Sequence, residues 1–178
     1  MTSQIKQLPN ALSLLRITAA ITFPAVSVSL QLPILIFALI TEFLDGYIAR
    51  KFNWETQLGK ILDPIADKLF AFSVGLTLVI SNKIELLSII FIYSRDITVS
   101  LGFLCWLFTP TKTHLAWSFS PNLMGKLTTV LQYLYFLNIL FKPIGYRLIF
   151  LITSIVSISS AILYTIEFFK KNQFRKNI

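Results

Sequence analysis

Four carboxylates stand close together in an otherwise strongly apolar chain. Glu42, Asp45, Asp63 and Asp67 are half of the eight acidic residues, and they fall within one stretch of 26 residues. The spacing is three residues in the first pair and four in the second, so a helix would place each pair on one face. An ionised group at membrane depth costs about 3 kcal/mol on insertion scales. These four residues are therefore the first candidates for a functional site.

Their chemistry suits a hard divalent cation. Carboxylate oxygens are the preferred ligands of Mg²⁺ and Mn²⁺, and the stretch offers no thiolate or imidazole for zinc. Two such ions would neutralise the acids and clamp a diphosphate. Two other interpretations remain open on the residues alone. The acids could pair with nearby lysines and arginines in a structural bundle, or they could line a proton or cation pathway. The regular spacing favours the metal and phosphate site.

Small and basic residues accompany the acids. Gly46, Ala49 and Gly59 would allow a nucleotide to approach the backbone closely, although small residues also pack membrane helices against one another. Arg50 and Lys60 can reach phosphate oxygens from the ends of their helices, and arginine can do so with two parallel hydrogen bonds.

The elements that position these residues must lie in a membrane. The chain has 178 residues, of which 55% are hydrophobic and only 13% are charged, and its mean hydropathy is +0.72. A soluble domain of this length would not need so much apolar surface. We therefore predict one domain over residues 1–178, an all-α bundle of six membrane spans. The expected spans are 11–30, 32–50, 58–81, 84–108, 120–141 and 143–169.

The basic residues predict the orientation of this bundle. With the N-terminus in the cytoplasm, thirteen of the sixteen lysines and arginines fall on the cytoplasmic side, and only Lys83, Lys142 and Arg147 fall on the other. Both termini are then cytoplasmic, and the four acids lie just inside the cytoplasmic interface. The net charge of +8 flanks apolar segments instead of forming one soluble stripe. It therefore indicates anionic lipids or a phosphate-bearing substrate as partners, and no nucleic acid.

The acidic stretch resembles the signature of the CDP-alcohol phosphotransferases, D-x2-D-G-x2-A-R-x8-G-x3-D-x3-D. Seven of its eight defined positions match, and all the gaps are correct. The departure is Glu42, which keeps the charge of the family's aspartate and adds one methylene. The number of expected spans and the chain length also resemble the family, so the likeness covers essentially the whole sequence.

The resemblance implies an enzyme that transfers a phosphatidyl group from CDP-diacylglycerol to an alcohol and releases CMP. It implies that Glu42, Asp45 and Asp63 ligate two divalent ions, Mg²⁺ or Mn²⁺, and that Asp67 is both a ligand and the general base. It further implies a homodimer in the bacterial cytoplasmic membrane. The cytidine nucleotide would be bound by the remaining signature residues, Gly46, Ala49, Arg50 and Gly59.

Three further segments concern the acceptor alcohol. Asn10–Arg16 and Gly125–Gln132 resemble the NxLTxxR and GKxxTxxQ motifs shared by phosphatidylglycerophosphate synthases and CMP-forming cardiolipin synthases. They favour an acceptor of the glycerol-phosphate type, either glycerol-3-phosphate or phosphatidylglycerol. Ser94–Asp96 is more similar to the cardiolipin synthases. We expect Arg95 and Lys126 to bind the acceptor phosphate; the alternative is that both side chains extend to the membrane interface.

Overall fold

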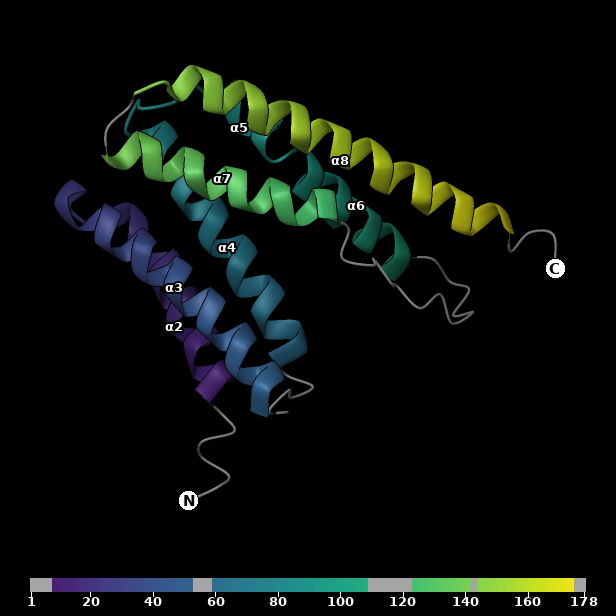
Figure 1. Cartoon of the computed structure of the whole chain (residues 1–178), viewed down its shortest axis with the longest axis horizontal. Coiled ribbons are helices and arrows are strands. Elements are labelled where there is room, and N and C mark those ends of the chain that lie inside the picture. Colours follow the sequence, from purple (N-terminus) through teal and green to yellow (C-terminus); the bar gives the residue numbers. More distant parts are fainter. Residues whose placement is uncertain (1–7, 53–58, 109–122, 142–143, 175–178) are drawn as a thin grey trace. The chain divides into compact units, whose positions relative to one another are not determined.

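The computed structural model describes residues 8–52, 59–108, 123–141 and 144–174, and every element within them is helical (Figure 1). The all-α prediction is confirmed for these residues. Contacts between residues divide the helices into two units, which are described separately. The first runs to Ile84 and also includes Leu140 and Phe141, and the second contains the other described residues from Glu85 onward. The elements are α2 (Leu8–Thr22), the 3₁₀ helix η1 (Phe23–Ala25), α3 (Val28–Phe52), α4 (Gly59–Ile80), α5 (Leu86–Ile92), α6 (Ser94–Phe108), α7 (Leu123–Phe141) and α8 (Tyr146–Phe174).

Four of the six expected segments each correspond to one helix, and the first does not. The segment 11–30 was expected to be continuous, but α2 ends at Thr22 and α3 begins at Val28, with the short η1 helix between them. Pro24 lies in the first turn of η1. A proline has no amide hydrogen to donate to the carbonyl four residues earlier, and its ring clashes with that carbonyl. The α-helix therefore stops before Pro24.

The expected segment 84–108 is also divided, into α5 and α6, with Tyr93 between them. The carbonyl of Ile92 accepts hydrogen bonds from the Gln132 side chain at 2.9 Å and the Ser157 hydroxyl at 2.8 Å. In an uninterrupted helix this carbonyl would accept the amide hydrogen of residue 96. Side chains that insert into the hydrogen-bond ladder of a helix are a known cause of kinks. Partners from two other helices thus explain a break that the apolar sequence did not predict.

In the first unit, α2 packs against both α3 and α4 (Figure 1). The rings of Phe23 and Phe70 meet edge to face with centroids 5.7 Å apart, and both side chains are fully buried. Near them, the Ser73 hydroxyl of α4 donates to the carbonyl of Ala20 in α2 at 2.5 Å. These contacts hold α2 against α4, and the register between the two helices determines which α2 side chains face the acids of α4.

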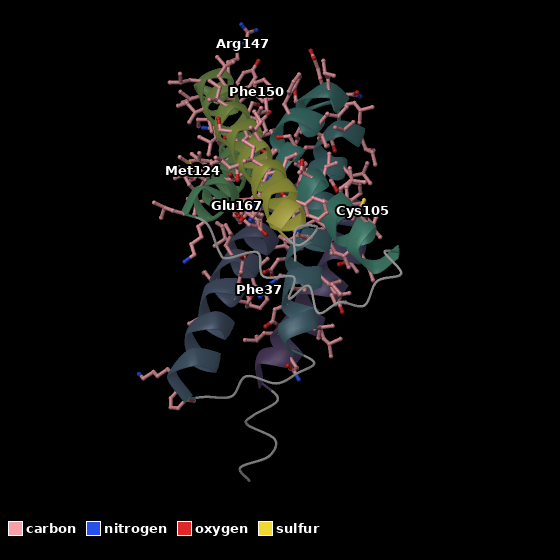
Figure 2. All side chains as sticks on the ribbon, turned by 90° about the vertical axis from the view of Figure 1, so that its right-hand side faces the viewer. Phe37, Cys105, Met124, Arg147, Phe150 and Glu167 are labelled. Atoms are coloured by element: carbon pink, nitrogen blue, oxygen red, sulfur yellow. The ribbon has the colours of Figure 1, made fainter. Side chains whose placement is uncertain are left out.

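In the second unit, α8 packs against α5 and α6. Two ring contacts join α7 to them: Phe136 of α7 meets Tyr93, between α5 and α6, with centroids 6.2 Å apart, and Tyr135 of α7 meets Phe150 of α8 at 6.1 Å. Figure 2 shows α8 with Arg147 near its beginning, Phe150 beyond it and Glu167 toward the C-terminal end. The helix follows Gly145, whose φ of +65° is the left-handed conformation that glycine adopts without strain.

Both units bury polar side chains beside their apolar core and expose many large apolar ones. Polar side chains lie inside, among them Ser13, Gln132 and Ser157, while large apolar side chains such as Ile21 and Ile80 are exposed. This distribution suits a chain surrounded by lipid, where polar groups are satisfied within the protein. By length and composition, one helix in the described part of the chain can cross a membrane, Tyr146–Phe168, with a mean hydropathy of 2.1. The six-span arrangement therefore remains a prediction.

Candidate active site

Two of the four candidate acids lie on α4, each with a partner from α2. Asp63 and Asp67 are four residues apart, and Ser13 and Arg16 are three apart, so each pair occupies one helical face. The Ser13 hydroxyl donates to Oδ1 of Asp63. The Arg16 guanidinium forms an ion pair with Oδ1 of Asp67. The first helix thus presents a donor to each acid of the α4 pair.

The ion pair is asymmetric in its access to solvent. The Arg16 side chain is 1% exposed, whereas that of Asp67 is 32% exposed. A buried guanidinium requires a carboxylate or an equivalent acceptor, since an uncompensated charge in the interior is costly. Arg16 therefore fixes one end of the Asp67 carboxylate while the residue stays partly accessible to solvent.

The convergence of all four acids is not tested in full. Glu42 lies partly buried on α3, and the side chain of Asp45 is outside the described part of the chain. Among the described residues, no three of histidine, cysteine, aspartate and glutamate come together as a metal site. Glu42, Asp63 and Asp67 alone do not form such a group, and the four-carboxylate centre remains a prediction.

Most of the residues predicted to bind the nucleotide have side chains outside the described part of the chain. The side chains of Ala49 and Arg50, and the surroundings of Gly46, lie outside the described part of the chain, although all three positions belong to α3. Gly59 is buried as the first residue of α4. Their role in binding a nucleotide stays a prediction.

In the second unit, Arg95 lies in the first turn of α6 and contacts residues of three helices. Its Nη1 donates to Oδ1 of Asp96 and to the hydroxyl of Thr129, each at 3.3 Å. Its guanidinium carbon lies 5.6 Å from the centre of the Tyr164 ring, within the range of a cation–π contact. Its Nε is buried and makes no hydrogen bond to the residues that the structure describes. Arg95 is thus held in place by side chains of α6, α7 and α8.

Lys126 differs from Arg95 in its surroundings. It is exposed on α7, whereas its neighbour Gly125 is buried against Arg95. No hydrogen bond or ion pair of Lys126 occurs within the described ranges. Lys126 and Arg95 make no contact with each other within the described ranges, so the prediction that both bind the acceptor phosphate rests on the sequence.

The donor chemistry of the first unit fits a hard divalent cation, because every candidate ligand is a carboxylate. Asp63 and Asp67 would contribute to such a site from α4 and Glu42 from α3. Their hydrogen bonds to Ser13 and Arg16 would orient the ligands, which is the usual role of the groups surrounding a metal site.

The two acceptor motifs contain Ser13, Arg16, Thr129 and Gln132, but the motifs alone assign these residues no role. The signal was nevertheless present. The Ser13 and Arg16 spacing matches the face of an α2 helix that packs on acids spaced by four. Thr129 and Gln132 likewise share the α7 face that meets Arg95 and Asp96.

Comparison with known proteins identifies the family of the chain. The family model described as CDP-alcohol phosphatidyltransferase matches residues 6–165. That range takes in both the α2–α4 acids and the Arg95 contacts. The chain is also similar to individual bacterial proteins over much of its length.

Three of these are each named CDP-diacylglycerol–glycerol-3-phosphate 3-phosphatidyltransferase. The protein from Aquifex aeolicus is 33% identical over 153 residues, which are 79% of this chain and 81% of the relative. The Bacillus subtilis protein is 30% identical over 77% of this chain and 70% of the relative. The Rickettsia typhi protein is 38% identical over 54% of this chain and 58% of the relative, a little more than half of that protein's length. This chain belongs to the CDP-alcohol phosphatidyltransferase family, and it is an enzyme that transfers a substituted phosphate group in phospholipid biosynthesis.

Proposed function

We propose that this protein transfers the phosphatidyl group of CDP-diacylglycerol to glycerol-3-phosphate, giving phosphatidylglycerophosphate and CMP. The observation that carries the proposal is the family match over residues 6–165 together with relatives that are named for this activity. The ion pair between Arg16 and Asp67 agrees with it, because it holds in place the carboxylate that the reaction needs as a base.

In the proposed reaction, Asp67 accepts the proton of the acceptor hydroxyl. The hydroxyl oxygen forms a bond to the phosphorus that carries the diacylglycerol, and the bond from that phosphorus to the phosphate oxygen of CMP breaks. Arg16 orients Asp67, and Ser13 orients Asp63. When bound by Glu42, Asp45, Asp63 and Asp67, two Mg²⁺ or Mn²⁺ ions would supply positive charge against the diphosphate and the leaving CMP. Gly46, Ala49, Arg50 and Gly59 would bind the cytidine nucleotide.

The acceptor phosphate is assigned to Arg95, with Lys126 as a second cation. The contacts that hold the Arg95 guanidinium in place support this role, since arginine binds phosphate through several donors in one plane. Ser94–Asp96 alone favoured phosphatidylglycerol as the acceptor, but the relatives named above all carry glycerol-3-phosphate in their names. We therefore assign glycerol-3-phosphate and keep phosphatidylglycerol as the alternative.

The distribution of basic residues supports six spans with both termini in the cytoplasm and an active site facing it. We place the protein in the bacterial cytoplasmic membrane, where its donor lipid resides, as a homodimer and a single domain.

CMP release tests the function. Purified protein in mixed micelles receives CDP-diacylglycerol, Mg²⁺ or Mn²⁺, and either glycerol-3-phosphate or phosphatidylglycerol. We expect metal-dependent CMP release with glycerol-3-phosphate and formation of phosphatidylglycerophosphate. Release with phosphatidylglycerol alone would assign the protein to cardiolipin synthesis. No release with any alcohol would overturn the enzymatic proposal.

A further inference from the structure

The break between α5 and α6 has a chemical cause that the structure shows, and it starts a new helix at Ser94. The cause is that the side chains of Gln132 and Ser157 donate hydrogen bonds to the carbonyl of Ile92. As a result, Ser94, Arg95 and Asp96 form the first turn of a new helix. An acidic residue is favoured in that turn by the helix dipole. The break therefore sets the position in α6 from which the Arg95 side chain reaches Thr129 of α7 and Tyr164 of α8.

Gln132 connects this break to Arg95. Its side-chain nitrogen donates to the Ile92 carbonyl and to Oδ2 of Asp96, each at 2.9 Å. An amide NH₂ has two hydrogens, so both are used. Asp96 in turn accepts from Arg95 through its other oxygen, Oδ1. Gln132 is only 2% exposed, so this chain of hydrogen bonds is shielded from water where it begins.

The backbone of α7 at Gly125 lies close to the Arg95 guanidinium and leaves it little room to move. A Cβ atom at this position would lie 2.8 Å from Nη2 of Arg95 and 2.9 Å from the hydroxyl oxygen of Tyr164. Both distances are shorter than carbon makes with such atoms, so either side chain would have to move. The guanidinium thus fits between the α7 backbone at Gly125, the Tyr164 ring and the carboxylate of Asp96.

We propose that Gln132, with Asp96 and Gly125, is a positioning residue that fixes the guanidinium of Arg95 for the phosphate of the acceptor. Gln132 acts through Asp96 and does not itself touch the substrate. The inference rests on the proposed function, because it takes Arg95 as the acceptor-phosphate residue. It goes beyond that function by naming the groups that set the affinity for the acceptor.

The test separates KM for glycerol-3-phosphate, KM for CDP-diacylglycerol and kcat in the CMP-release assay. Gln132→Met keeps the side-chain length and removes both donors. We expect it to raise the acceptor KM about tenfold, as expected for loss of a hydrogen bond to a charged group, with the CDP-diacylglycerol KM within about twofold. Ser160→Ala is the matched control, because Ser160 is also fully buried on a helix of this unit and its hydroxyl has no hydrogen bond to the described residues. It should change neither KM.

Gly125→Ala provides a second variant that does not depend on the folding of Gln132→Met. Alanine is a better helix former than glycine, and the atoms that its Cβ meets are the ends of flexible side chains, so the helix should form. The acceptor KM should again rise several-fold. In an Arg95→Ala background, neither substitution should raise the acceptor KM further, since the group that they position is gone.

The outcomes distinguish this inference from the function on which it rests. If Arg95→Ala raises the acceptor KM while Gln132→Met and Gly125→Ala do not, the positioning inference is wrong and the proposed function stands. A similar rise in both KM values together with a fall in kcat would show a merely structural role for Gln132 and would also overturn the inference. If the unmodified protein releases no CMP with glycerol-3-phosphate, the proposed function fails and takes the inference with it.

Discussion

Replacing Arg16 is the most direct test of the geometry around Asp67. Arg16→Gln removes the positive charge that holds Oδ1 of Asp67. Breaking a fully buried ion pair by removing one partner costs about 3–5 kcal/mol. Because 32% of the Asp67 side chain is exposed, water can replace part of the lost interaction, and we expect about 2 kcal/mol. If the whole loss raises the activation free energy of the step in which Asp67 accepts the proton, kcat decreases about 30-fold.

The assay is initial-rate CMP release at saturating CDP-diacylglycerol and glycerol-3-phosphate, with thermal unfolding measured on the same preparations. Arg16→Lys keeps the charge and should recover part of the rate. Ser73→Ala is the matched control, because it also removes a hydrogen bond between α4 and α2, the one to the Ala20 carbonyl, without touching an acid. It should leave kcat within about twofold, the scatter allowed for distant sites. A folded Arg16→Gln protein with normal kcat, or an equal loss in Ser73→Ala, would refute the role of Arg16.

Three other predictions concern the acids and the metal. Asp67→Asn should lower kcat at least about 100-fold through loss of the general base, while binding of CDP-diacylglycerol largely survives in an equilibrium assay; unchanged turnover would exclude Asp67 as the base. Glu42→Asp restores the residue typical of the family and should give equal or higher CMP release, whereas a severe loss would mean that the bundle is fitted around glutamate. Treatment with a chelator should stop CMP release, and added Mg²⁺ or Mn²⁺ should restore it; full activity in the chelator would contradict the carboxylate–metal proposal.

The fold was predictable where local sequence decides it. Long apolar segments predicted helices, and four of the six agree with the structure because an apolar helix satisfies its own backbone hydrogen bonds. The end of α2 was also encoded locally, in Pro24, although the expected segment 11–30 ran through it. The break at Tyr93 was not predictable in this way. It depends on Gln132 and Ser157, which lie 40 and 65 residues from Ile92 in the chain.

The sequence by itself determined the family and the acids, because a signature of eight positions with fixed gaps is specific without any contact being known. Spacing along a helix could likewise predict that Asp63 and Asp67 share a face. Only the tertiary structure decided that Ser13 and Arg16 are their partners, since this depends on the register of α2 against α4. It also placed Arg95 among Asp96, Thr129 and Tyr164, and left Lys126 exposed. Those contacts arise from packing between distant helices, which residue spacing within one helix does not specify.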